Sequence, residues 1–277
     1  MLLSHGNILT NSWQAGKLAD IGESDVVMCF LPLFHVNGLV ITGIAPLFAG
    51  AQIVLRKGFS AGEFWDCVAK YRVSIFSGVP TIYQILLATP GSENLDLSSL
   101  RYGVCGAAPM PVEAIKKFES QFNMIIVEGY GLTEGTAGAT ANPINGVRKI
   151  GSIGVPFEES EVKIFDDDDN ELPTGEVGEI VIRGGNVMKG YYNKPEDTEK
   201  TLRGGWLHTG DMAYKDEDGY LFIVDRKKEM IIRGGENIYP KELEEIMYSH
   251  PAVQEVAVVG VKAVSYTHLT LPTKRIV

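Results

Sequence analysis

Short apolar runs alternate with helical segments along the first half of the chain, and this alternation constrains the fold more than any other feature. The strand-like runs are 26–31, 52–55, 73–76, 101–105 and 124–127. The helical segments are 7–19, 36–48, 61–71, 81–88 and 112–122. Strand-like runs that alternate with helices are typical of parallel sheets that are covered on both faces. The sequence therefore predicts an α/β fold built on a doubly wound, mostly parallel sheet.

The pattern changes after about residue 150. Runs 161–165, 179–183 and 220–224 alternate apolar and polar residues between turn signals, which indicates a small β-rich subdomain. The acidic run 166–169 is most simply a solvated turn, and a Ca²⁺ loop is the less favoured alternative. A helix from Pro240 and a strand at 253–261 then begin an α+β unit too short to be complete.

The 277 residues exceed a typical single domain, and we divide them by these changes of pattern. Residues 1–150 are the α/β part of a large domain, and 151–224 are its β-rich subdomain. Residues 225–263 are a hinge and the start of a truncated C-terminal domain. Residues 264–277 match neither a helix nor a strand and resemble translated sequencing adapter, so we expect a non-native tail.

Charge and cysteine content limit the partners and the compartment. The net charge of −10 argues against a general nucleic-acid or anionic-membrane surface. Cys29, Cys67 and Cys105 lie in apolar settings without metal-type spacing, which predicts buried, reduced thiols. The first residues lack the basic region and hydrophobic block of a signal peptide. We expect a cytoplasmic protein, with peripheral attachment to a membrane left open.

Residues 26–55 carry no Lys, Arg, Asp or Glu and are long enough to resemble a membrane span. Pro32, residues 35–38, Pro46 and Gly50 interrupt the apolar sequence. We therefore expect a strand, loop, helix and strand in a buried core, and no integral membrane span.

Residues 128–135 read EGYGLTEG and directly follow the apolar run 124–127. Ligands of open α/β sheets bind where the carboxyl ends of the strands open into loops. In a parallel sheet the loops 32–35, 77–81 and 106–109 would gather at that same edge. The motif is therefore expected to form part of a ligand site.

The residue types of this motif suit a ring, a phosphate and a metal. Gly129 and Gly131 permit close approach of the backbone, and Tyr130 offers a ring face to a base. The Thr133 hydroxyl can donate to a phosphate oxygen, and the Glu134 carboxylate can hold Mg²⁺. An ordinary glycine-rich turn remains the alternative for such a short match taken by itself.

Four motifs occur together and in order: PLFH at 32–35, YGLTE at 130–134, GWLHTGD at 205–211, and DRKKEMI at 225–231 with its continuation to Pro240. In this order and spacing they resemble the adenylate-forming superfamily, and within it an acyl-CoA synthetase. The resemblance covers residues 3 to about 261. The PLFH loop and the stretch before Pro240 look most like medium- or long-chain fatty-acyl-CoA ligases.

The resemblance implies a two-step reaction that uses ATP, Mg²⁺ and CoA. A carboxylic acid would attack the α-phosphate of ATP to give acyl-AMP and pyrophosphate, and the thiol of CoA would then displace AMP. The first step requires cations around the phosphorus oxygens. The expected partners are therefore a small carboxylic acid, ATP and CoA, with no nucleic acid. The oligomeric state stays open.

The resemblance also assigns roles to individual residues. Thr133 would contact phosphate, Glu134 would bind Mg²⁺, and Asp211 would accept hydrogen bonds from the ribose hydroxyls. Arg226 would reach the ribose or phosphate, since a guanidinium stays charged. The residues expected around the adenine and its phosphates are Gly106, Ala107, Ala108, Pro109, Gly129, Tyr130 and Gly131.

Three further roles follow from the resemblance. Asp225 would be the hinge before the C-terminal unit, although a surface ion pair is the simpler alternative. The catalytic residues would be Thr133, Glu134 and His35. His35 would act as a gate, and a buried core histidine is the competing interpretation. The acyl pocket would be lined by Phe34, Val79 and Gly106, all of which could equally be core residues.

Two parts of the family pattern are absent from the chain. A phosphate loop normally precedes the sequence LSHGN at 3–7, and a catalytic lysine normally lies beyond the last residue. Lys274 does not match that lysine. We therefore expect an internal fragment with little or no turnover. The alternatives are an adenylation domain that loads a carrier protein and a non-catalytic nucleotide-binding module.

Overall fold

The computed structural model describes residues 1–108, 110–233, 236–248, 250, 252–253 and 256–260. Its larger sheet has the strand order β2-β1-β3-β4-β5-β6-β7. The strands are β1 (Val26–Cys29), β2 (Gln52–Leu55), β3 (Ile75–Gly78), β4 (Tyr102–Cys105), β5 (Ile125–Tyr130), β6 (Thr140–Ala141) and β7 (Val155–Pro156). The strands from β1 to β5 pair in parallel, whereas β6 and β7 are antiparallel. The predicted mostly parallel α/β sheet is confirmed.

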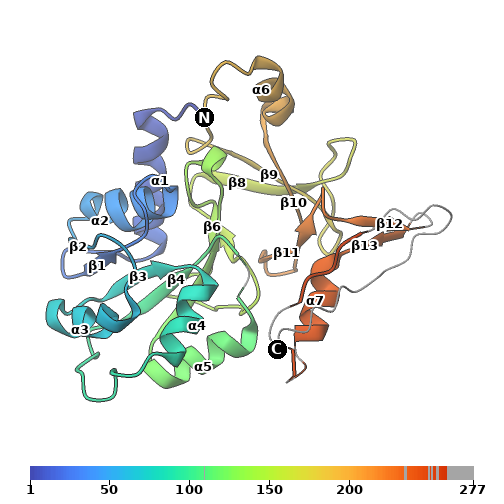
Figure 1. The fold of residues 1–277 in the computed structure, drawn as a ribbon. Coiled ribbons are helices and arrows are strands. Elements are labelled where there is room, and N and C mark those ends of the chain that lie inside the picture. The colour runs from blue at the N-terminus through green and yellow to red at the C-terminus, as the bar shows by residue number, and fades with distance from the viewer. Residues whose placement is uncertain (109, 234–235, 249, 251, 254–255, 261–277) are drawn as a thin grey trace.

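Helices cover both faces of this sheet, as Figure 1 shows. One face packs on α3 (Ala61–Tyr71), α4 (Pro80–Ala88) and α5 (Val112–Phe122) through an aromatic core that includes Trp65, Tyr83 and Phe118. The other face packs on α1 (His5–Leu18) and α2 (Ala45–Phe48). Ser4 caps α1 by accepting from the backbone N–H of Asn7.

The segment 36–48 is helical, as its sequence predicts, but it contains two kinds of helix. Residues Asn37–Ile44 form a π-helix, η1, which continues into α2. A Cβ at Gly38 would lie 2.5 Å from the carbonyl oxygen of Pro32, so the helix start is pressed against the end of the preceding strand. The local periodicity contains no sign of this tertiary contact, so the sequence predicts a helix but not its π-helical part.

A second, antiparallel sheet follows in the order β11-β10-β9-β8. Its strands are β8 (Ser160–Phe165), β9 (Gly178–Gly184), β10 (Leu207–Lys215) and β11 (Leu221–Arg226). Its apolar face packs against Tyr130, Leu132 and Ala139, so the chain after β5 lies against both sheets. This is the predicted β-rich unit, and the predicted boundary at residue 150 falls just before β7.

The acidic run 166–169 forms the predicted turn after β8. The carboxylate of Asp166 accepts from the backbone N–H groups of Asp168 and Asn170 at 2.9 and 2.8 Å. Asp167 and Asp169 also make ion pairs, so the turn is not purely solvated.

Short elements connect and follow this sheet. They are the 3₁₀ turns η2 (Thr133–Gly135) and η3 (Arg203–Gly205), α6 (Pro195–Thr201), the hairpin of β12 (Ile231–Arg233) and β13 (Glu236–Ile238), and α7 (Pro240–Tyr248). The strand expected at 253–261 is not present at residues 253 and 256–260, and the rest of it lies outside the described residues. The expected tail at 264–277 also lies outside them.

The three cysteines are buried and unpaired, as predicted. In the part of the chain that the structure describes, no helix combines the length and the apolar character that crossing a membrane requires.

Candidate functional site

The loops selected by the sequence leave one edge of the larger sheet. Because β1, β3, β4 and β5 run parallel and neighbour one another, their carboxyl ends lie together. The backbone N–H of Gly106 donates to Gly78 across two of these ends at 3.4 Å. A Cβ on Gly106 would lie 3.4 Å from the carbonyl oxygen of Gly129, so the loops after β4 and β5 are also in contact. The predicted gathering of loops is confirmed.

Tyr130, Asp211 and Arg226 form a connected group where the two sheets meet. The Tyr130 hydroxyl donates to Oδ2 of Asp211 at 2.6 Å, and Nε of Arg226 lies 3.2 Å from Oδ1. Burial, with the adjacent Asp211 carboxylate, raises the pKa of the Tyr130 phenol well above its ordinary value, so the phenol keeps its proton. The Arg226 side chain is 69% exposed. Its guanidinium can therefore contact a ligand without leaving the carboxylate.

Glu134 lies in η2, and a loop distant in sequence holds it there. Tyr191 donates its hydroxyl to Oε1 of Glu134 at 2.8 Å, and the N–H of Met188 donates to the Glu134 carbonyl oxygen at 2.8 Å. Asn186 contacts the same turn through Gly135 and Thr136. The neighbouring Thr133 is half-buried.

Tyr191 binds the Glu134 carboxylate through Oε1, an arrangement that is compatible with a role for Oε2 in Mg²⁺ binding. Mg²⁺ is commonly held by one or two carboxylates, waters and substrate phosphates rather than by an all-protein cage. Among the described residues no group of three His, Cys, Asp or Glu side chains is arranged for a metal. The Glu134 carboxylate fits a metal that is held mainly by substrate phosphates.

The glycines of the motif have a structural reason of their own. A Cβ at Gly131 would lie 1.6 Å from the carbonyl oxygen of Ala137, so no side chain fits there. A Cβ at Gly129 would approach Ala141 to 3.3 Å. Gly131 is thus required by the fold of the turn itself, whether or not a ligand approaches.

The loop after β4 has an unusual backbone. Ala107 has φ of 67°, a left-handed conformation that is uncommon for a residue with a side chain. Ala108 is exposed beside it, and Pro109 lies outside the described residues. Such backbone strain is typical of functional sites, and the role of the loop at adenine stays a prediction.

The residues expected around an acyl group do not form a closed pocket. Phe34 is 94% exposed, and His35 is exposed with Nδ1 accepting from the N–H of Asn37 at 3.3 Å. Val79 instead packs against the aromatic core. The gate and pocket roles stay predictions.

Asp225 connects β11 to α7. Its Oδ1 accepts from the N–H of Arg226 at 2.7 Å, and its Oδ2 accepts from the N–H of Lys241 at 3.2 Å. Asp225 is buried, which differs from the simple alternative of a surface ion pair. Its role as a hinge stays a prediction.

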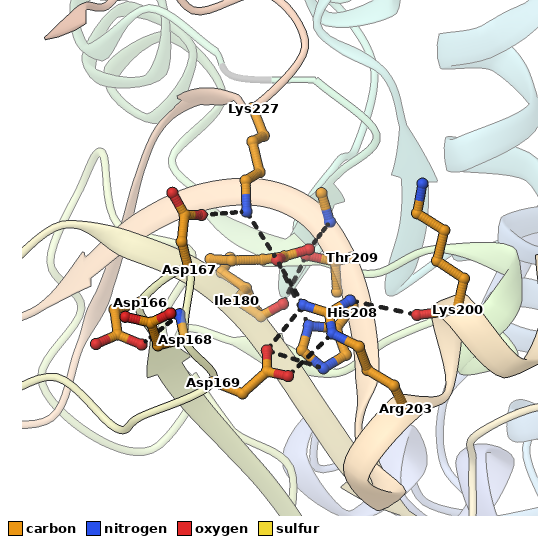
Figure 2. A network of polar contacts seen from close by, with 12 residues as sticks. Asp166, Asp167, Asp168, Asp169, Ile180, Lys200, Arg203, His208, Thr209 and Lys227 are labelled. Carbon is orange, nitrogen blue, oxygen red and sulfur yellow. Dashed lines mark hydrogen bonds and ion pairs between the residues drawn. The ribbon is translucent and has the colours of Figure 1, made fainter. Parts of the chain in front are cut away.

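Figure 2 shows a polar network that contains Arg203, His208 and Lys227. Sequence reasoning missed Glu179 on β9, which belongs to this network. Its buried carboxylate lies close to His208, Arg203 and Lys227. A charged residue directly before the apolar run 180–182 was the signal that could have identified it. Tyr191 was also missed, because nothing in its local sequence marks its contact with Glu134. Glu128, the first residue of the motif at 128–135, was given no role of its own.

The family model described as AMP-binding enzyme matches residues 1–192. A long-chain-fatty-acid–CoA ligase of Bacillus subtilis is 43% identical over 264 residues, which are 94% of this chain and 47% of that protein. A feruloyl-CoA synthase of an Amycolatopsis species is 40% identical over 261 residues, which are 94% of this chain and 53% of that protein. The chain therefore spans about half the length of these curated relatives.

A solved structure agrees over the same extent. The o-succinylbenzoate coenzyme A synthetase of Bacillus subtilis, in complex with ATP and magnesium ion, has a TM-score of 0.86 and 31% sequence identity. The match covers 98% of this chain and 57% of that one.

Proposed function

The chain belongs to the AMP-binding enzyme family, and on that premise we propose that it carries the nucleotide-binding part of an ATP-dependent acid–CoA ligase. The reaction would couple a carboxylic acid to AMP and then transfer the acyl group to the thiol of CoA. The observation that carries this proposal is the Asp211 carboxylate, held between the Tyr130 hydroxyl and the Arg226 guanidinium at the meeting of the two sheets.

In this proposal each residue of the group has a distinct task. Asp211 accepts hydrogen bonds from the ribose hydroxyls, because a carboxylate offers two acceptor oxygens. Tyr130 presents its ring to adenine while its hydroxyl holds Asp211 in place. Arg226 contacts the ribose or α-phosphate and orients Asp211.

The phosphates would lie toward η2. Thr133 donates its hydroxyl to a phosphate oxygen, and Glu134 provides a carboxylate for Mg²⁺. When bound, Mg²⁺ would neutralise the oxygens around the reacting phosphorus. Tyr191 fixes Glu134 through Oε1 and leaves Oε2 for the metal.

The acid is proposed to be a fatty acid, because the PLFH loop and the Bacillus subtilis relative both favour that class. The exposed Phe34 and His35 would be the residues that a fatty chain covers. The relative that is named for feruloyl-CoA marks aromatic acids as the competing class.

Calorimetric titration of the chain with AMP, GMP and 2′-deoxy-AMP tests the nucleotide site. We expect AMP to bind more tightly than both analogues and Asp211→Asn to abolish the preference for the ribose hydroxyl. Equal affinity for AMP and 2′-deoxy-AMP in the unmodified chain would contradict the site.

ATP–pyrophosphate exchange tests the acid class. Because little turnover is expected of the chain by itself, it is extended by the phosphate loop and the C-terminal domain of its Bacillus subtilis relative. Hexadecanoate, ferulate and a mixture of amino acids are supplied separately to this fusion. Exchange with hexadecanoate supports a fatty-acid ligase, whereas exchange with amino acids alone would favour a domain that loads a carrier protein.

A further inference from the structure

The strand that bears Asp211 departs from regular pairing just before that residue. His208 pairs with Val181 and Met212 pairs with Glu179, so residues 209–211 of β10 form a bulge opposite Ile180. Gly210, in the middle of the bulge, has φ of +76°, a conformation that glycine adopts without strain. The bulge directs Asp211 away from β9 toward Tyr130 and Arg226.

Glu179 holds the centre of this bulge. Its side chain is buried, and Oε1 accepts from the N–H of Gly210 at 2.8 Å. Oε2 lies 3.4 Å from Nζ of Lys227, and the N–H of Lys227 donates back to the carbonyl oxygen of Gly210 at 2.9 Å. The N–H and the carbonyl oxygen of Gly210 are therefore both hydrogen-bonded within one closed ring of Glu179, Gly210 and Lys227.

The surrounding charges explain why a buried carboxylate is tolerated there. Nδ1 of His208 lies 3.5 Å and the Arg203 guanidinium 3.8 Å from Oε2 of Glu179. Asp167 and Asp169 complete the ion pairs of Lys227 and Arg203 at 2.7 and 2.8 Å. A buried ion that is paired and hydrogen-bonded avoids most of its desolvation cost, so the network keeps Glu179 in place.

We propose that Glu179 is a positioning residue that fixes the Thr209–Gly210–Asp211 bulge so that the Asp211 carboxylate can meet the ribose hydroxyls of a nucleotide. The inference rests on the proposed function for the role of Asp211. It does not make Glu179 a ligand, because its two oxygens face Gly210 and the cations of the network.

The hydrogen bond by which Glu179 fixes the bulge is tested first without a nucleotide, by hydrogen exchange of the Gly210 amide measured by NMR. We expect strong protection in the unmodified chain and exchange faster by about tenfold in Glu179→Gln, whose amide oxygen cannot serve Gly210 and Lys227 together. Glu179→Asp should show the same faster exchange as Glu179→Gln, because its side chain is one methylene too short to reach the N–H of Gly210. Glu161→Gln, on the neighbouring strand with an exposed ion pair to Arg183, is the matched control.

Rapid exchange of Gly210 in the unmodified chain would overturn the proposal, even if the variants failed to fold.

The functional consequence is tested with AMP and 2′,3′-dideoxy-AMP as probes. Glu179→Gln should weaken AMP binding about fivefold and change dideoxy-AMP binding less than about twofold, because the lost interaction is that of the ribose hydroxyls. A purely structural role would weaken both probes equally and would overturn the proposal. Lys227→Met keeps the Glu179–Gly210 bond and should keep the preference for AMP. A complete loss of that preference in Lys227→Met would also overturn it.

Asp211→Asn separates this inference from the function on which it rests. If Asp211→Asn leaves AMP binding unchanged, the ribose role of Asp211 is wrong and the positioning role falls with it, whereas the exchange of Gly210 still reports whether Glu179 holds the bulge. If Asp211→Asn weakens AMP binding and Glu179→Gln does not, the positioning role alone is wrong.

Discussion

The hydroxyl of Tyr130 lies 2.6 Å from Oδ2 of Asp211, although 81 residues separate them in the sequence. Tyr130 ends the last long strand of the larger sheet, and Asp211 lies in the bulge of β10 in the second sheet. This hydrogen bond therefore joins the two sheets at the candidate site. It also orients the carboxylate, since the second oxygen of Asp211 faces Arg226.

Tyr130→Phe should weaken AMP binding about fivefold, because the ring that faces adenine remains but the Asp211 carboxylate loses a buried donor. Asp211→Asn should weaken it at least as much. The double variant should lose about 1 kcal/mol less AMP-binding free energy than the two single variants lose together, since the two residues act through one hydrogen bond. Calorimetric titration of the four proteins measures this coupling.

Tyr214→Phe, on the same strand as Asp211, is the control for removing a phenolic oxygen. Additive losses in the double variant would show that the hydrogen bond does not orient Asp211.

Tyr191→Phe should raise the Mg²⁺ concentration needed for half-maximal ATP binding about tenfold, because a residue that orients a metal-binding carboxylate tunes the affinity of the metal. Binding of AMP without Mg²⁺ should be unchanged. Titration of Mg²⁺ at fixed ATP measures the shift. Tyr192→Phe is the matched control, since the adjacent Tyr192 is 69% exposed.

An unchanged Mg²⁺ requirement in Tyr191→Phe would contradict the prediction that Tyr191 orients Glu134 for Mg²⁺ binding.

Gly131→Ala should destabilise the chain by about 3 kcal/mol, because the new Cβ collides with the carbonyl oxygen of Ala137 and the backbone must move. Gly62→Ala is the control: Gly62 lies in α3 with no heavy atom within 4 Å of a Cβ, so alanine should stabilise by about 0.5 kcal/mol. Urea unfolding measures both changes. Equal stabilities for the two variants would contradict the close packing at Gly131.

The larger sheet could be predicted because its signals are local. Runs such as 52–55 and 112–122 carry their periodicity within the element, and β2 and α5 have those same bounds. The strands β6 and β7 have two residues each, too few for a periodic signal. The π-helix from Asn37 depends on the contact of Gly38 with the preceding strand, which local sequence does not contain.

The candidate site divides in the same way. Tyr130, Glu134 and Asp211 lie in motifs with recognisable spacing, so their sequence surroundings identified them. The contact of Tyr191 with Glu134 spans 57 residues, and the contact of Glu179 with Gly210 depends on the register of β9 and β10. Neither contact follows from periodicity or from a motif.

Glu128, on β5 beside the candidate site, should make the stability of the chain depend on pH. Burial raises the pKa of its carboxyl from 4.5 to about 7, and the N–H of Gly151, which donates to Oε2 at 2.9 Å, only partly opposes this rise. The folded chain therefore keeps a proton on Glu128 that the unfolded chain loses above its ordinary pKa. The contribution of Glu128 to stability should be greatest below about pH 4.5, fall between 4.5 and 7, and then level off, with a total loss on the order of 2 kcal/mol.

Glu128→Gln tests this dependence, because an amide keeps the acceptor for Gly151 without carrying a charge. The variant should be more stable than the unmodified chain at pH 8 and nearly equal to it at pH 4.5, in urea unfolding at a series of pH values. Glu113→Gln, with a side chain 85% exposed on α5, should leave the pH profile unchanged. If Glu128→Gln and the unmodified chain lost stability in parallel between pH 4.5 and 7, the proton would reside on another group.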